Sequence, residues 1–374
     1  MTSEESRFET DPGALVGDLV DTHPALPSGW HVGQPDPEDR FDLAGLTRLL
    51  RDHERQGRGW AGSSVEDVLV EVSAPALRTR QNLVIRDADG AIRAWGGVHD
   101  RAGGRMLLLD IVDRGLDDDT ARACSEVIIE WAVAQARSVG AARGLSVQQI
   151  DTGTYADDER QAGWLADSGF TRVRTWWQMS RPVGAEETDL VPSTQSWEGR
   201  GVRFRRVRAA TSGVDAGMPD ERDLRAVHDV LEEAFRDHFN SWEETFEEFV
   251  HRIRESPGHR WDHWWLAELV GDDDVHEDAD LEPVGALIGT VSHTNDGPDG
   301  SYVAYLGVRE AARGRGVAKG LLRTIITDAA SRGRDRVGLE VDADSETGAT
   351  GLYESMGWTT SYVTESWHRD VPVD

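Results

Sequence analysis

Hydrophobic and polar positions follow the same order twice along the chain. In the first half, apolar positions spaced three and four residues apart predict a helix over 41–54, and alternating or continuous apolar runs come after it. The elements expected next are a hairpin over 82–99, a strand over 106–112, a helix over 120–140, a strand over 144–150, and a helix, turn and strand over 160–179.

The second half shows a matching succession. The expected elements are a strand over 202–209, a helix over 223–235, paired strands over 264–270 and 283–293, a strand over 301–308, a helix over 317–333, a strand over 336–342, and a helix, turn and strand over 348–363. Superposed by eye, LADSGF of the first half falls on YESMGW of the second, which places Leu165 on Tyr353. We interpret this repetition as a duplication.

Strands that alternate with helices predict an α/β or α+β fold, with a mixed sheet covered by helices in each half. The length of 374 residues suits two domains. The segment 181–200 is rich in Pro, Gly, Ser and acidic residues, as is typical of a linker. The predicted organisation is a polar tail over 1–28, a first domain over 29–180, this linker, and a second domain over 201–374.

Composition then narrows the class of protein. Hydrophobic residues make up 38% and charged residues 29%, as in an ordinary folded protein. The chain has neither a run of about twenty apolar residues nor a basic start followed by an apolar core, so we expect no membrane partner and a cytoplasmic location. The net charge of -29, with Lys319 as the only lysine, argues against a nucleic-acid partner. The single cysteine, Cys124, is expected to be a small buried residue.

The stretch YLGVREAARGRGVAKGLL (305–322) carries the strongest chemical signal. An apolar strand runs into a turn rich in Arg and Gly that opens a helix. Unpaired N–H groups and the positive end of the macrodipole make such a helix start a binding site for phosphate. Gly314 and Gly316 allow close approach of the backbone, and Arg313 and Arg315 add positive charge. The alternative is a surface turn with two solvated arginines.

A second motif follows this loop. A strand over 338–341 leads into DADSETGATGLYESMGW, in which Ser345 or Thr347 can cap a helix that carries Tyr353. The pattern R-x-x-G-x-A, followed by VDADSxTGAxxLYxxxGW, resembles the GNAT acyltransferase superfamily over nearly all of the second half. Two such units in tandem, of which the second is intact, resemble mycothiol synthase and related tandem actinobacterial acetyltransferases.

The resemblance implies two tandem domains, each with a mixed, mostly antiparallel sheet whose central strands are splayed, here 302–308 and 337–341. It also implies acetyl-CoA as co-substrate, with its pyrophosphate on the loop and its pantetheine arm in the splay. The residues implied in cofactor binding are Leu306, Val308, Arg313, Gly314, Arg315, Gly316, Val317, Ala318 and Ser345. Tyr353 stands where the family has a tyrosine that donates a proton or a hydrogen bond to the departing thiolate. The alternative for Tyr353 is an aromatic ring that packs the last helix.

The general base is where the sequence departs from the family. A primary amine with a pKa of about 10 must lose a proton before it attacks a thioester. Mycothiol synthases are expected to carry a carboxylate on the strand before the loop, where this chain has Tyr302, Ala304 and Tyr305. The candidate replacements are Glu268, His293 and Glu340. Glu340 is the weakest of these, because a charge on a strand usually faces solvent.

The first half lacks the features of the second. Asp117, with Asp118 and Asp119 beside it, stands where the second half has Arg313, and these acids would repel a pyrophosphate. Leu165 replaces Tyr353. We interpret the first half as a degenerate copy that supports the active half. The alternative is a second acyl-CoA site that has lost catalysis. In the second half, the stretch around His238, Phe239 and Trp242 is either an acceptor wall or an amphipathic surface helix.

The sequence therefore predicts an acetyl-CoA-dependent N-acetyltransferase that acts on a primary amine of a small molecule in its C-terminal half. The histidines show no paired ligand spacing, so no metal is expected. We expect a monomer or homodimer. Two alternatives remain: a non-catalytic acyl-CoA-binding sensor or partner protein, and a protein N-acetyltransferase.

Overall fold

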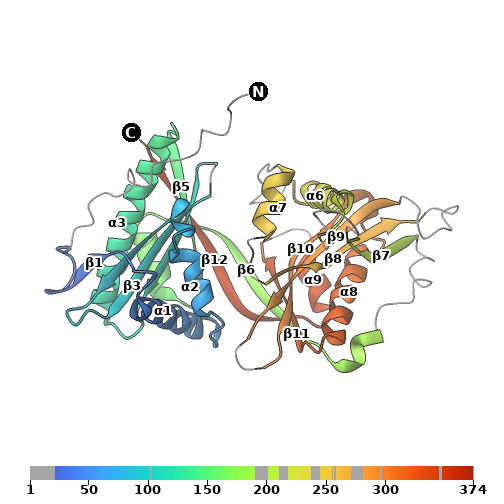
Figure 1. Ribbon diagram of the computed structural model, residues 1–374, viewed down its shortest axis with the longest axis horizontal. Coiled ribbons are helices and arrows are strands. Elements are labelled where there is room, and N and C mark those ends of the chain that lie inside the picture. Colours follow the sequence, from blue (N-terminus) through green and yellow to red (C-terminus); the bar gives the residue numbers. More distant parts are fainter. Residues whose placement is uncertain are drawn as a thin grey trace. The chain divides into compact units, whose positions relative to one another are not determined.

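The structure, a computed structural model, describes residues 22–101, 103–189, 201–209, 218–236, 245–254, 256, 258–270, 281–294, 297–344 and 348–373. They form two compact units (Figure 1). The N-terminal unit comprises the chain up to Trp177, together with Asp342–Asp344 and the chain from Tyr362 onward. The C-terminal unit comprises Gln178–Val341 and the segment that ends at Ser361.

The two halves of the chain have the same order of elements. The first half contains β1 (His31–Gly33), α1 (Arg40–Arg58), α2 (Val65–Val72), η2 (Ala76–Arg78), β2 (Arg80–Arg86), β3 (Ile92–Asp100), β4 (Arg105–Val112), α3 (Asp118–Ala142), β5 (Val147–Tyr155), α4 (Glu159–Asp167) and β6 (Thr171–Pro182). The second half contains η3 (Ala185–Asp189), β7 (Val202–Arg206), α6 (Glu221–Phe235), α7 (Phe246–Arg254), β8 (His259–Leu269), β9 (Glu282–Ser292), β10 (Gly300–Val308), η4 (Glu310–Ala312), α8 (Val317–Ser331), β11 (Arg336–Asp342), α9 (Ala349–Glu354) and β12 (Thr359–Pro372).

Each unit contains a mixed sheet that is mostly antiparallel. The strand order is β1-β2-β3-β4-β5-β12 in the N-terminal unit and β6-β11-β10-β9-β8-β7 in the C-terminal unit. The central strands are parallel, β4 with β5 and β10 with β11. The other pairings of β1 to β4 and of β7 to β10 are antiparallel. The predicted fold class is therefore confirmed.

The last strand of each half does not stay with its own repeat. Strand β12 enters the N-terminal unit, where Thr364 to Pro372 pair antiparallel with Tyr155 to Val147 of β5. The end of β6, from Gln178, belongs to the C-terminal unit beside β11. This division differs from the predicted domains, 29–180 and 201–374, because a strand joins a sheet through hydrogen bonds to its neighbours and not through its place in the chain. The predicted linker lies outside the described residues from position 190 onward, and the predicted tail does so up to position 21.

Helices cover both faces of the sheet in the C-terminal unit. A Cβ atom on Gly285 of β9 would lie 2.6 Å from Val317 of α8, and one on Gly289 would lie 2.9 Å from Ile325. Helix α8 therefore packs close against this face. The alternate residues Ala286 and Ile288 point the other way, into a core shared with α6 and α7. The sheet thus fixes the position at which α8 begins.

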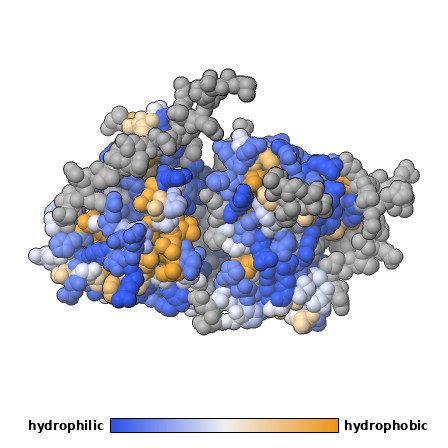
Figure 2. All heavy atoms as spheres, viewed as in Figure 1, coloured by the Kyte–Doolittle hydropathy of each residue, from blue (hydrophilic) through white to orange (hydrophobic). Residues whose placement is uncertain are grey.

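The face of the molecule in Figure 2 is mostly hydrophilic, with a patch of apolar residues over α2 of the N-terminal unit. Trp60, Val70 and Leu77 are exposed large hydrophobic residues of the N-terminal unit. In the part of the chain that the structure describes, we find no helix long and apolar enough to cross a membrane.

Candidate functional site

The two parallel strands of the C-terminal unit separate halfway along their length. Strands β10 and β11 pair at three positions, the last of which joins Val303 to Leu339. Strand β10 continues to Val308, and its pairing with β9 shifts register between Val303 and Tyr305. Beyond Val303 the edge of β10 that faces β11 therefore has backbone groups without a strand partner. Such an edge can bind an extended ligand that carries amide groups.

The loop after β10 forms a helix start that lacks a cap. Gly314 and Gly316 have φ of 78° and 81°, and Gly316 is the N-cap of α8 without a side-chain cap. Within the described chain, the N–H groups of Gly316, Val317 and Ala318 have no acceptor. These donors and the positive end of the helix dipole create a binding site for an anion.

Two arginines lie beside this helix start. Arg313 and Arg315 are exposed, and within the described residues neither forms an ion pair. Unpaired guanidinium groups next to free N–H donors suit the multiple charges of a pyrophosphate. The structure thus brings together the residues of the predicted loop. Ser345, also predicted to bind the cofactor, lies outside the described residues, as do His238, Phe239 and Trp242.

The corresponding helix start in the N-terminal unit is already occupied by a carboxylate. Asp117 is the N-cap of α3, and its side chain accepts a hydrogen bond of 3.0 Å from the N–H of Thr120. This bond lowers the pKa of the Asp117 carboxyl. Asp118 and Asp119 add negative charge in the first turn. An incoming pyrophosphate would meet like charges here.

Polar side chains also fill the splay of the N-terminal unit. A recess there is lined by His53, Asp110, Val112, Asp113, Arg114, Asp158, Arg160, Gln161 and Trp164. Asp110 of β4 is buried, and its Oδ2 accepts a hydrogen bond of 2.6 Å from Ser125. Burial raises the pKa of Asp110 to about 7. In β10 the corresponding residue is Leu306, so the two splays differ in chemistry.

We expect Asp110 to make the N-terminal unit less stable as the pH rises. In the unfolded chain this carboxyl ionises near pH 3.9, whereas in the folded unit it stays protonated up to about pH 7. The free energy of unfolding therefore falls across this window, by on the order of a few kcal/mol. Asp110→Asn removes that fall, which urea denaturation at pH 5 and pH 8 measures. The matched control is Asp119→Asn at the exposed start of α3. Equal pH dependence in wild type and Asp110→Asn would contradict the argument.

Tyr353 of α9 lies in the C-terminal unit with its ring packed edge-on against Trp358, at 6.1 Å between centroids. The side chain is 8% exposed, and its hydroxyl has no hydrogen-bond partner among the described residues. Burial raises the pKa of Tyr353 to about 12, so the hydroxyl keeps its proton at neutral pH. A hydroxyl without a partner in the described protein is an available donor to a ligand.

Leu165 is the structural counterpart of Tyr353. The N–H of Phe170 bonds to the carbonyl of Leu165, as the N–H of Trp358 bonds to that of Tyr353. Leu165 is fully buried and carries no donor. The superposition of the two halves by sequence therefore agrees with their geometry.

Glu268, predicted as a candidate base, belongs to an ion-pair network. It lies on β8 and is 3% exposed. One carboxylate oxygen accepts bonds of 3.0 and 2.8 Å from Arg203, and the other accepts bonds of 2.9 and 2.7 Å from Arg205. Strand β9 separates β8 from β10. This geometry argues against the predicted role, because both oxygens are engaged and the splay is two strands away.

His293, a second candidate for the base, lies near the start of β10, away from the splay. It follows β9, whose last residue Ser292 pairs with Gly300 at the start of β10. Its side chain is exposed, and its Nδ1 lies 3.1 Å from Oδ2 of Asp299. The splay opens only after Val303, so the structure does not bring this imidazole to it.

Glu340, the third candidate for the base, lies on β11 beside the point where β10 and β11 separate. It is the first residue of β11 beyond the last pair with β10. Gln178 of β6 donates a hydrogen bond from Nε2 to its Oε2. The signal available in the sequence was the alternation in VGLEV, which places Glu340 and Gly338 on the face opposite three apolar residues.

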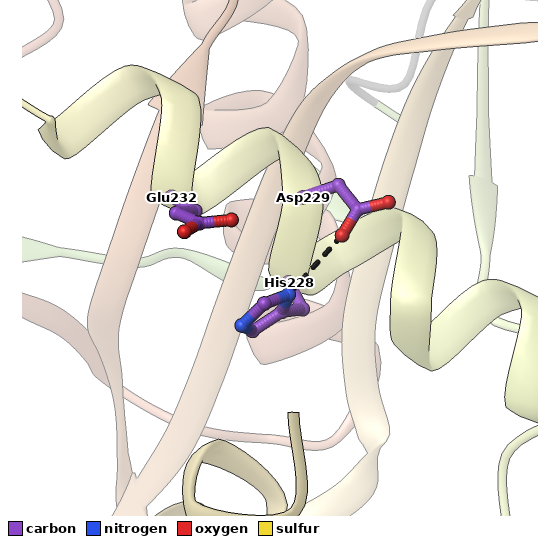
Figure 3. Close-up of side chains that lie close together, drawn as sticks. All are labelled: His228, Asp229 and Glu232. Atoms are coloured by element: carbon purple, nitrogen blue, oxygen red, sulfur yellow. Dashed lines mark hydrogen bonds and ion pairs between the residues drawn. The ribbon is translucent and has the colours of Figure 1, made fainter. Parts of the chain in front are cut away.

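A group of three potential metal ligands lies on α6 (Figure 3). It consists of His228, Asp229 and Glu232, and the Nδ1 of His228 lies 3.1 Å from Asp229. The His228 ring packs edge-on against Phe246 and Phe249 of α7, while both acids are exposed. These contacts explain the histidine by packing, and the expected absence of a metal stays a prediction.

Comparison with known proteins agrees with this geometry. Residues 227–358 match the model of the Acetyltransferase (GNAT) family. The chain is 30% identical over 233 residues to the mycothiol acetyltransferase of Thermobispora bispora, a match that covers 59% of this chain and 68% of that protein. The chain belongs to the GNAT acetyltransferase family. It is an N-acetyltransferase, and its co-substrate is acetyl-CoA.

Solved GNAT structures share the fold over most of the chain. A GCN5-related N-acetyltransferase from Sphaerobacter thermophilus has a TM-score of 0.69 and 21% identity, over 93% of this chain and 97% of that one. A tandem GNAT protein from the clavulanic acid biosynthesis pathway has a TM-score of 0.63 and 14% identity, over 92% of this chain and 100% of that one. The predicted tandem GNAT fold is confirmed.

Proposed function

We propose that the C-terminal GNAT unit is the catalytic one and that it acetylates a primary amine of a small molecule. One observation carries this proposal: the start of α8 offers free N–H donors and unpaired arginines, whereas Asp117 occupies the start of α3. A pyrophosphate is stabilised at the first site and repelled at the second.

Each part of the site then has a role. The N–H groups of Gly316 to Ala318, with Arg313 and Arg315, bind the pyrophosphate. The free edge of β10 around Leu306 and Val308 binds the pantetheine arm by backbone hydrogen bonds. A backbone N–H at the register shift of β10 polarises the thioester carbonyl. Tyr353 donates its hydroxyl proton, or a hydrogen bond, to the leaving sulfur.

A small amine is the acceptor that the relatives favour. The similar protein from Thermobispora bispora is a mycothiol acetyltransferase, whose name refers to a small molecule. The surrounding protein is strongly acidic, with a net charge of -29, which favours a cationic acceptor such as an ammonium ion. A protein acceptor is the competing outcome of the test below.

Titration calorimetry with acetyl-CoA, followed by a turnover assay, tests the proposal. We expect one acetyl-CoA per chain and release of CoA with at least one of three thiol-free acceptors: an amino sugar, a polyamine and a lysine peptide. A thiol reagent reports CoA cleanly, because Cys124 is buried and burial raises the pKa of its thiol to about 12.

Four outcomes discriminate the alternatives. Turnover of the amino sugar or the polyamine supports a small-molecule acceptor, and turnover of the peptide alone supports a protein acetyltransferase. Two binding sites per chain would overturn the assignment of the site to one unit. Binding without turnover of any acceptor would favour an acyl-CoA sensor.

A further inference from the structure

Glu340 lies level with the register shift of β10. Val303 and Leu339 form the last pair of β10 and β11, at the usual spacing of about 4.8 Å between strands. The next residue on each strand is Ala304, where the register shift begins, and Glu340. In the proposed function, a backbone N–H at this register shift polarises the thioester carbonyl. The carboxylate of Glu340 lies opposite that point, on the neighbouring strand β11.

The side chain of Glu340 points to the face that α6 and α7 cover. Val303 pairs with Gly289, whose Cβ direction leads to Ile325 of α8, so Val303 faces α8. Tyr302, one residue earlier, faces the opposite side. A Cβ on Gly338 would lie 3.1 Å from the Tyr302 ring, so Gly338 is on that side as well. Glu340 follows Gly338 at the strand period of two and shares its face.

The neighbour of Glu340 comes from the first repeat. Gln178 lies on β6, the strand that the first half contributes to the C-terminal unit. Its amide donates a hydrogen bond to Oε2 of Glu340. This bond fixes one carboxylate oxygen and leaves Oε1 without a partner among the described residues.

We propose that Glu340 is the general base of the acetyl transfer and that Gln178, supplied by the first repeat, is its positioning residue. The proposal rests on the proposed function of the C-terminal unit. Oε1 of Glu340 accepts a proton from the acceptor amine as the nitrogen forms its bond to the acetyl carbon. The bond between that carbon and sulfur breaks, and the hydroxyl of Tyr353 donates a hydrogen bond to the leaving thiolate. Solvent carries the proton from Glu340 to the thiolate, so the net products are the amide and CoA with its thiol protonated.

The environment of Glu340 suits this role. The surrounding protein raises the pKa of its carboxyl by loss of hydration, although the side chain is exposed at the splay. The Gln178 hydrogen bond opposes this shift in part. No charged group in the described chain contributes to it. A carboxylate with a raised pKa is a stronger base toward the proton of an amine.

Two variants and one control test the proposal on the full chain. With the amine that the wild-type enzyme acetylates, Glu340→Gln is expected to lower kcat about 100-fold. Its affinity for acetyl-CoA, measured by calorimetry, is expected to stay the same. Gln178→Ala removes the bond that lowers the carboxyl pKa, so the acidic limb of kcat/KM against pH moves to higher pH while the plateau rate is largely kept. Glu354→Gln, at an exposed position of α9, is the control. It is expected to keep the wild-type kcat and the wild-type pH profile.

The outcomes separate this proposal from the proposed function. A Glu340→Gln variant that binds acetyl-CoA and turns over like wild type would overturn the role of the base and leave the catalytic unit as assigned. An acidic limb that stays in place in Gln178→Ala would remove the positioning role, even if the variant were less stable. Wild-type protein that binds acetyl-CoA but acetylates no amine would overturn the proposed function, and the base with it.

Discussion

Phenylalanine in place of Tyr353 is expected to lower kcat about 100-fold while the affinity for acetyl-CoA stays the same. The hydroxyl has no partner among the described residues and is held by burial at a pKa of about 12. A thiol has a pKa of about 8.5, so complete proton transfer to the thiolate is uphill by several units. Most of the effect is therefore expected from a hydrogen bond that strengthens as charge develops on sulfur.

Kinetics and calorimetry on Tyr353→Phe distinguish an effect on the chemical step from an effect on acetyl-CoA binding or on the packing of the last helix. Tyr353→Phe keeps the ring against Trp358, so folding is preserved. Tyr155→Phe in the N-terminal unit is the matched control, because burial also raises the pKa of that tyrosine to about 12. Steady-state kinetics gives kcat and calorimetry gives the affinity. A Tyr353→Phe enzyme with wild-type kcat would show that this residue only packs the last helix.

Reversal of the loop charges, Arg313→Glu with Arg315→Glu, is expected to weaken acetyl-CoA binding at least 100-fold. Each arginine is exposed and free of ion pairs in the described chain, so its charge is available to the pyrophosphate. A hydrogen bond to a charged group contributes about 1.5–3 kcal/mol, and each glutamate adds repulsion. A loss of about 3 kcal/mol corresponds to more than 100-fold in Kd.

The control must change the net charge equally, because the whole protein is acidic. Arg78→Glu with Arg137→Glu reverses two exposed arginines of the N-terminal unit for which no ion pair is seen among the described residues. Calorimetry on both pairs of variants, at matched ionic strength, compares the two sites. If the control weakened binding as much as the loop variant, the effect would come from the overall field and not from the loop.

The exchange of last strands gives the first repeat a function that its own sequence does not suggest. Its helix start is occupied by Asp117 and its splay is filled by Asp110 and neighbouring polar groups. Yet its strand β6 completes the C-terminal sheet and brings Gln178 to Glu340. In the proposed function, the first repeat therefore contributes a positioning residue to the site of the second repeat.

The sequence by itself determined the features that depend on short stretches of chain. The order of helices and strands follows from local periodicity, and the helix start at Gly316 follows from glycines that adopt positive φ. The equivalence of Leu165 and Tyr353 could be seen because each lies at a fixed spacing before a glycine turn. These patterns need no knowledge of distant residues.

Only the tertiary structure decided which strands pair and which way a strand side chain points. The pairing of β7 with β8 places two arginines beside Glu268, and these contacts have no signal in the local sequence. The pairing of Gly338 with Tyr302 fixes the face of the sheet on which Glu340 lies. The partner of β12 could not be read from its sequence, because hydrogen bonds between strands join segments about 200 residues apart and carry no local signature. Register and pairing are properties of the whole sheet, and in this protein they select the candidate base.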